Sequence, residues 1–316
     1  SDPATWDAGN VPGLSARVSI PLGVTVGCEM TEAVVEGIEV DGTLSVGNSH
    51  LKVVNLFVLP SGALTITGHS EVVFSDVSLR LAEDPDQYGN GLLVWGTIRV
   101  NGAEKTPFVR LAKSPRAGDL TLELALDPIG WQAGDRIGLP ETRQANLNIV
   151  DDSKRWIETA TIRQIAGRFI TLSAPLQFDH LGARNADGTE ELFPHAANLT
   201  RSIVFRSENY AGVRAHAIAF DRATVSVHNA AFLDMGRTTT AALDRVTNHI
   251  GRYSFHCHHV YGPKIPTSDR QFEFVGNVVA NAELHPTSRR RWGIAIHDSH
   301  FGLVKSNVVF NAADGA

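Results

Sequence analysis

The chain has 316 residues with a formal net charge of −6, of which 20% are charged and 43% are hydrophobic. This length is enough to bury a substantial core, in one large domain or in two ordinary ones. The acidic balance excludes nucleic-acid binding through bulk positive charge. No apolar run approaches the ~20 residues of a membrane-spanning helix. The two cysteines, Cys28 and Cys257, are too few for a disulfide framework.

Alternating apolar residues form a repeat in the first hundred positions. Each copy has apolar residues at alternate positions, then a glycine, then a second alternating run, and the copies begin at Ile38, Val58 and Leu92. Short alternating runs of Val, Ile and Thr, broken by many glycines, are typical of an all-β protein. Repeats of about 20 to 50 residues indicate a stacked architecture. The pattern therefore predicts coils of a β-helix, with loops inserted at the corners.

Regular coils resume after residue 199, and three of them align on an asparagine. Asn229, Asn277 and Asn307 each close an apolar strand. Asparagine tolerates the left-handed backbone of a β-helix corner, so we expect these side chains to stack along the axis. With this alignment, three preceding strands face the core with equivalent pairs of residues: Ile218 and Phe220, Phe255 and Cys257, and Ile294 and Ile296.

The segment 251–261, GRYSFHCHHVY, and its echo 291–300, RWGIAIHDSH, place histidines at alternate positions. Because alternate residues of a strand share a face, His256, His258 and His297 are expected on the outer face. The alignment puts Asp221 in the column of His258 and His297. Asp, His and His can bind a divalent ion with one open position, so we predict a zinc or calcium site with His256 as a further ligand. The alternatives are a surface histidine ladder and a metal that only clips the coils together.

Asp221 and Asp234 form a candidate carboxylate pair. Cleavage of a glycosidic bond requires one carboxyl to protonate the leaving oxygen and a second to act as base or nucleophile. The same carboxylates could instead bind calcium or remain solvated. At the starts of the histidine strands, Arg252-Tyr253 and Arg291-Trp292 supply arginines for uronate carboxylates and aromatic rings for sugars. Arg252 and Arg291 occupy aligned positions, which also suits a structural role.

Several motifs in order resemble the eight-glycine-domain family of hyaluronan-depolymerising proteins, fibrocystin-like proteins and bacterial relatives. They include the opening Trp-x-x-Gly-x-x-Pro, the glycine-marked repeats and Gly-Trp-x-x-Gly-Asp-x-Ile at 130–137. The resemblance implies an N-terminal glycine-rich β domain stacked on a right-handed parallel β-helix. We place that domain at 1–143, a connector with irregular coils at 144–198, and the regular coils at 199–316.

The resemblance also implies a function. The important carboxylates and basic residue of the hyaluronan-depolymerising relatives fall at Asp221, Asp234 and Arg214. The leading prediction is an extracellular, cell-surface or periplasmic glycoside hydrolase that cleaves an acidic polysaccharide such as hyaluronan, using Asp221, Asp234 and His258. The alternatives are a non-catalytic carbohydrate-binding or adhesion module and a metal-assisted polysaccharide lyase. The sequence ends soon after a strand, so a further segment or a partner is expected to cover the last coil.

Overall fold

The computed structural model describes residues 2–143, 156–262, 270–281 and 291–311. Apart from a 3₁₀ turn, η1 (Pro3–Thr5), the regular elements of these residues are β-strands. The strands belong to two compact units, Ser1–Ala103 with Arg201–Ala316, and Glu104–Thr200. The expected boundaries at 143/144 and 198/199 differ from these, because the repeats of the first hundred residues and the later coils form a single β-helix.

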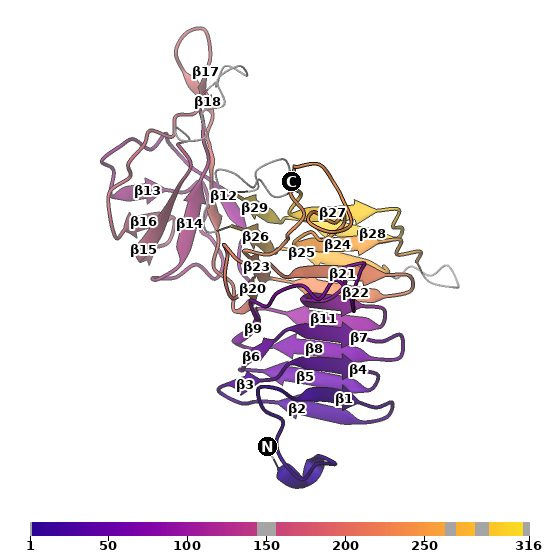
Figure 1. Cartoon of the computed structure of the whole chain (residues 1–316). Coiled ribbons are helices and arrows are strands. Elements are labelled where there is room, and N and C mark those ends of the chain that lie inside the picture. The colour runs from indigo at the N-terminus through magenta and orange to yellow at the C-terminus, as the bar shows by residue number, and fades with distance from the viewer. Residues whose placement is uncertain (1, 144–155, 263–269, 282–290, 312–316) are drawn as a thin grey trace. The chain divides into compact units, whose positions relative to one another are not determined.

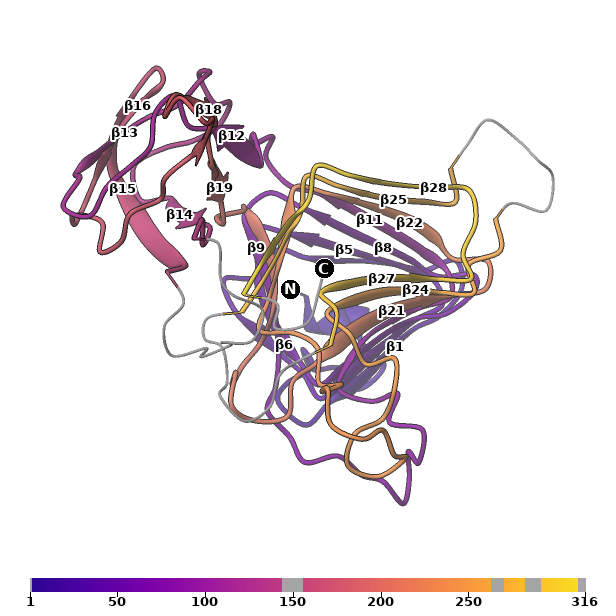
Figure 2. The same ribbon diagram turned by 90° about the horizontal axis from the view of Figure 1, so that it is seen from above.

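The first unit is a right-handed parallel β-helix of seven coils, each with one strand in each of three seven-stranded parallel sheets. Viewed along the axis, the sheets form the three sides of a triangle (Figure 2). In Figure 1 the coils are stacked from β1–β3 to β27–β29. Sheet A contains β1 (Arg17–Ile20), β4 (Gly37–Val40), β7 (Asn55–Val58), β10 (Gly91–Val94), β21 (His216–Phe220), β24 (Phe255–His258) and β27 (Ile294–His297).

The other two sides of the triangle are built in the same way. Sheet B contains β2 (Thr25–Cys28), β5 (Thr43–Gly47), β8 (Ala63–Thr67), β11 (Thr97–Asn101), β22 (Thr224–His228), β25 (Phe272–Val275) and β28 (Gly302–Lys305). Sheet C contains β3 (Ala33–Val34), β6 (His50–Val53), β9 (Ser70–Phe74), β20 (Ile203–Ser207), β23 (Ala230–Leu233), β26 (Val278–Ala280) and β29 (Val308–Phe310).

The core of the β-helix lies inside the triangle and follows from the alternation of each strand. Strand β5, for example, alternates half-buried and buried residues, and Leu44 and Val46 point inward. In the later coils the interior contains stacked aromatic rings. The ring centroids of Phe205 and Phe232 are 4.9 Å apart, and those of Phe255 and Phe274 are 4.1 Å apart. Such stacked ring contacts add to the stabilisation from burial.

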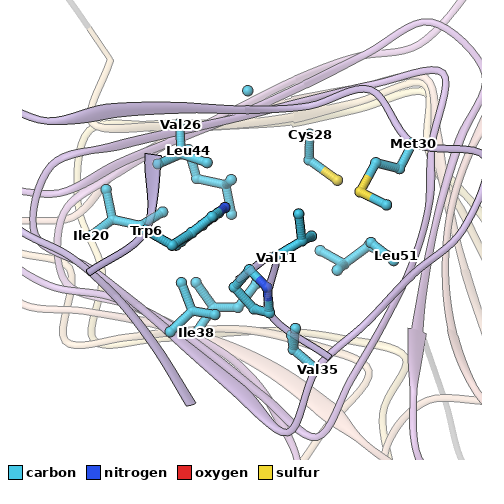
Figure 3. A pocket seen from close by; sticks show the side chains of 14 residues that line it. Trp6, Val11, Ile20, Val26, Cys28, Met30, Val35, Ile38, Leu44 and Leu51 are labelled. Carbon is cyan, nitrogen blue, oxygen red and sulfur yellow. The ribbon is translucent and has the colours of Figure 1, made fainter. Parts of the chain in front are cut away.

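The first coil is covered by the segment that precedes β1. In Figure 3 the side chains of Trp6 and Val11 lie among apolar residues of the first coils, including Ile20 and Leu44. A small apolar cavity of about 70 Å³ remains there. The opening Trp-x-x-Gly-x-x-Pro motif therefore supplies side chains that close this end of the core.

The repeat glycines lie where the corner of one coil approaches the main chain of the previous coil. A Cβ added to Gly62 would lie 1.9 Å from the Val40 carbonyl oxygen, and one added to Gly96 would lie 2.2 Å from that of Leu59. Only glycine fits such a contact, since the obstructing atoms belong to the backbone. These glycines therefore set the distance between successive corners.

Gly62→Ala should lower the free energy of unfolding by about 3 kcal/mol, since the backbone must shift to admit a methyl group. Gly27→Ala is the control, because a Cβ at Gly27 meets no atom within 4 Å. Its expected change is within about 0.5 kcal/mol. Urea unfolding of both variants measures the difference. Equal stabilities would show that the close approach at Gly62 is not needed.

The inserted unit is an antiparallel sheet ordered β12-β19-β14-β15-β16-β13, with a separate β17-β18 hairpin. Its buried ion pair joins Lys105 Nζ to both carboxylate oxygens of Asp135 at 2.8 Å. The Gly-Trp-x-x-Gly-Asp-x-Ile motif therefore has a structural role here, with Trp131 and Ile137 in the core of this unit. The strands are β12 (Phe108–Arg110), β13 (Thr121–Glu123), β14 (Arg136–Leu139), β15 (Glu158–Ala166), β16 (Phe169–Leu172), β17 (Ala183–Arg184), β18 (Glu190–Leu192) and β19 (His195–Asn198).

The asparagine column contains two of the three expected residues. Asn307 Oδ1 accepts a hydrogen bond from the main-chain N–H of Asn277 at 2.8 Å, so these two residues stack as predicted. Asn229 lies one position earlier, because His228 pairs with Val275 and Val275 with Lys305. Its φ of 53° makes it the left-handed corner residue. The prediction that Asn229 belongs to this column is therefore wrong by one residue.

Candidate metal centre

The outer face of sheet A carries the predicted histidines. Phe255 and Cys257 point into the core, as expected, and burial raises the pKa of the Cys257 thiol to about 12. His258 pairs with His297 in the neighbouring strand, and His256 lies two residues before His258 on the same face. One ligand atom from each of these three histidines lies within 4.8 Å of the other two. The structure thus brings together three of the four predicted metal ligands.

A cleft of about 670 Å³ lies over this face. The segment after β9 contributes Tyr88, the segment before β24 contributes His249 and Ile250, and Trp292 precedes β27. The three histidines also line the cleft. Among its described lining residues there is no Asp or Glu.

His256 is held in one tautomer. It is 3% exposed, and its Nδ1 lies 3.0 Å from the main-chain oxygen of Gly251. A carbonyl oxygen can only accept, so Nδ1 carries the proton and Nε2 carries the lone pair. Nε2 is buried and has no hydrogen-bond partner among the described residues. Burial lowers the pKa of His256 to about 4, so the ring is neutral at neutral pH. A histidine that binds a metal ion through one ring nitrogen usually donates the N–H of the other to a carbonyl or carboxylate oxygen, as His256 does here.

His258 and His297 complete the group. Their Nδ1 atoms are 3.0 Å apart. Burial, followed by neighbouring His259 and His297, lowers the pKa of His258. With metal–nitrogen bonds of about 2.05 Å, a separation of 3.0 Å corresponds to an angle of about 95° at one shared ion. Three imidazole nitrogens are the donor type that transition-metal ions prefer, and this group lacks the oxygen ligands that calcium requires.

Asp221 does not join this group. His258 pairs with Phe220, so Asp221 lies in the column of His259, at the corner after β21. Asp221 is exposed, with a φ of 51°. Its predicted role as a ligand beside His258 is therefore wrong, because the pairing of Ile218 with His256 and of Phe220 with His258 differs by one residue from the predicted register, and such a slip exchanges the two faces of β21.

Asp234 and Arg214 lie at the opposite end of β21 from Asp221. Arg214 immediately precedes the strand region and is 1% exposed, with its Nη2 3.9 Å from Asp234 Oδ1. The five residues of β21 separate the ends by about 16 Å. Paired carboxylates of glycosidases are about 5 to 9.5 Å apart. Asp221 and Asp234 are therefore not brought together as the sequence prediction required.

Arg252 holds the cleft wall in place. It is 4% exposed, and its guanidinium donates to the carbonyls of Gln87, Asp86 and Ile250. Its Cζ also lies 4.6 Å from the centre of the Tyr88 ring. These donors are directed to the protein backbone, which favours the structural alternative predicted for Arg252. Burial, the largest effect, lowers the pKa of Arg252.

The other predicted substrate-binding residues divide into two kinds. Arg291 is half-buried and its Nε donates to Thr239 O at 2.9 Å, which favours its structural alternative. Tyr253 is 3% exposed and packs edge-on against Trp292, with 5.1 Å between ring centroids. Trp292 is 43% exposed and lines the cleft. Trp292 is thus the predicted residue best placed to stack on a ligand.

Two features of this face are not predicted from the sequence. Tyr88 comes from a segment far away in the chain, and no local pattern indicates where that segment lies. Ile218 and Phe220 point outward, where Phe220 stacks on Trp95 with 4.9 Å between ring centroids. All five residues of β21, HAIAF, are buried. A nearly unbroken apolar run is typical of a strand that is covered on both faces, and this run can be read from the sequence.

Comparison with known proteins gives two related sequences, and no family model matches the chain. The chain is 24% identical to Protein rliB of Dictyostelium discoideum over 225 residues, covering 66% of this chain and 19% of that protein. It is 27% identical to Fibrocystin-L of Mus musculus over 312 residues, covering 85% of this chain and 7% of that protein. The chain therefore spans less than a fifth of either relative. The second match agrees with the resemblance to fibrocystin-like proteins.

A comparison with solved structures finds phage tailspikes, with low TM-scores. The Gp54 tailspike of Acinetobacter baumannii bacteriophage AP22, solved with a capsular saccharide, has a TM-score of 0.26 and 13% identity, and the match covers 84% of this chain and 41% of that one. The gp49 tailspike of Pseudomonas phage LKA1 has a TM-score of 0.25 and 13% identity, with coverage of 87% and 44%. In the described residues, no helix has the length and apolar composition needed to cross a membrane.

Proposed function

We propose that the chain binds an acidic polysaccharide outside the cell, through a divalent transition-metal ion held by His256, His258 and His297. The observation that carries this proposal is the buried Nε2 of His256, which has no partner among the described residues. Leaving a buried polar atom unpaired costs about 1 to 3 kcal/mol, and coordination of an ion removes that cost. The chemistry of three imidazoles favours zinc.

The ion would keep an open position toward the cleft. Three protein ligands with a free fourth position are typical of zinc sites that bind an exchangeable ligand. A uronate carboxylate suits that position, and the exposed ring of Trp292 offers a face to the adjoining sugar. The proposed ligand is therefore a polymer with a carboxylate on its sugar rings, such as hyaluronan or alginate.

A second candidate function is β-elimination at the same site. A metal ion that neutralises the uronate carboxylate makes the neighbouring ring proton more acidic, and a base must then remove it. His249 lines the cleft, and its Nδ1 lies 2.9 Å from Ile250 O, which leaves the Nε2 lone pair free to act as that base. The hydrolase alternative lacks this support, since the two predicted carboxylates are at opposite ends of β21.

Zinc binding and polymer retention test the proposal. Metal-free protein should retain hyaluronan or alginate weakly, and zinc should strengthen this retention while leaving neutral dextran unbound. His256→Gln should weaken zinc binding at this group by more than about 100-fold, beyond the loss usual for outer-shell partners. His69→Gln, at an exposed site, is the control. Zinc affinity unchanged in the His256 variant would refute the proposed centre.

The products distinguish binding from elimination. Zinc-dependent retention without any change in polymer length supports a binding site. Shortened chains with new absorbance from unsaturated ends support elimination, and His249→Gln should then abolish cleavage while leaving retention intact. Shortened chains without that absorbance would indicate hydrolysis and contradict the second candidate.

A further inference from the structure

A second group of metal-ligand side chains lies at the corner next to the three-histidine group. It consists of His259, His297 and Asp298, whose ligand atoms lie within 4.8 Å of one another. His259 Nε2 and His297 Nε2 are each 3.6 Å from the same oxygen, Asp298 Oδ2. Two imidazoles thus converge on one carboxylate oxygen from neighbouring coils.

These distances suit a shared ion better than hydrogen bonds. A separation of 3.6 Å is too long for an N–H···O hydrogen bond. With metal–ligand bonds of about 2.1 Å, it corresponds to an angle of about 120° at a common ion, close to the tetrahedral value for zinc. His259 Nδ1 lies 3.2 Å from the Tyr261 hydroxyl, which can orient the ring as an outer-shell partner.

The backbone of the corner presents these side chains together. His259 and Asp298 both have left-handed backbone, with φ of 54° and 41°. The main-chain N–H of His259 donates to His297 O at 2.9 Å, which fixes the two coils in register. Adjacent corner residues are about 4.8 Å apart in such a ladder, so their side chains can reach one ion.

His297 belongs to both groups through different ring nitrogens. Its Nδ1 faces Nδ1 of His258, and its Nε2 faces Asp298. We propose that His297 bridges two divalent ions, one held with His256 and His258 and the other with His259 and Asp298. The first of these ions is that of the proposed function, on which this inference rests.

The bridge requires the loss of one proton. A neutral imidazole has one lone pair and one N–H, so it can donate to only one ion. When the second ion binds, the remaining ring proton of His297 leaves to solvent and the imidazolate donates a lone pair to each ion. Two neighbouring divalent charges favour this deprotonation. No bond other than N–H is broken, and no oxidant or reductant takes part.

The stoichiometry of zinc binding tests both sites separately. The whole chain, first freed of metal, should bind two zinc ions, and Asp298→Asn should bind one. His256→Gln should also bind one, at the corner group, whereas His297→Ala should lose both high-affinity ions. Asp7→Asn, at an exposed and remote position, is the control and should bind two.

Each result has a distinct meaning. Binding of one ion by the wild type, unaffected by Asp298→Asn but weakened by His256→Gln, would overturn the second site and leave the proposed function standing. One ion that depends on Asp298 and not on His256 would overturn the proposed centre and the bridge together. If His256→Gln and Asp298→Asn each bound two ions, both the three-histidine site and the corner site would be overturned.

Copper(II) resonance spectra test the bridge itself. Two Cu(II) ions joined by an imidazolate couple magnetically, so the wild type should lose the ordinary isolated-ion signal on cooling. Asp298→Asn and His256→Gln, each with one ion, should give that signal in full. Binding of two zinc ions by the wild type should also release one proton more than binding of one zinc ion by Asp298→Asn. Two ions with uncoupled signals would contradict the bridge.

Discussion

Arg214→Met should lower the free energy of unfolding by about 3 to 5 kcal/mol, the range found when one partner of a buried charge pair is removed. Arg214 is 1% exposed, and its Nη1 donates to Asn281 Oδ1 and its Nε to Tyr210 O, both at 2.6 Å. Burial, opposed by Asp234, lowers the pKa of Arg214. Methionine replaces the side-chain volume but leaves the carboxylate and these acceptors without the guanidinium. Urea unfolding measures the loss.

The matched control is Arg80→Met at the surface. The Arg80 side chain is 62% exposed and lies 3.7 Å from Glu83, so this change should cost less than about 1 kcal/mol. A role in substrate binding makes a different prediction for Arg214, namely a loss of polymer retention at unchanged stability. Equal stabilities of the two variants would show that Arg214 does not stabilise the coil.

Acidification should destabilise the metal-free protein through His216. This ring is 0% exposed, and its Nδ1 lies 2.9 Å from Arg237 Nη1. Burial, then Arg237, Arg252 and His256, holds the pKa of His216 well below 6.5. Above pH 6.5 the ring is neutral in both the folded and unfolded states, and the stability is fully present. Below it the unfolded chain binds a proton that the folded chain does not, which costs about 1.4 kcal/mol per pH unit down to the folded pKa.

The comparison of wild type with His216→Gln isolates this contribution. Both proteins are measured in the presence of a chelator. As the pH falls below 6.5, the free energy of unfolding of the wild type should decrease more steeply than that of His216→Gln. His69→Gln, at an exposed position, serves as the control and should retain the wild-type pH dependence. Unfolding curves at several pH values give these slopes. Parallel slopes for wild type and His216→Gln would contradict a buried neutral His216.

The amino-acid sequence by itself determined the class of fold and the face that carries the histidines. The glycine-marked repeats become β4–β5, β7–β8 and β10–β11, each a pair of strands joined at a corner. Phe255 and Cys257 point inward, and His256 and His258 point outward. Such features follow from alternation within one strand, which is a local property with a fixed period.

Only the tertiary structure decided how the coils are aligned and what covers them. Phe220 pairs with His258 and Val225 with Phe272, so the corner after His258 is much longer than the corner after Phe220, and a sequence alignment through these corners has no fixed register. A slip of one residue placed Asp221 beside His258 instead of beside His259. The cleft wall at Tyr88 and the buried state of Arg252 likewise depend on segments far apart in the chain. A local pattern carries no information about such contacts, because they form only when the coils are stacked.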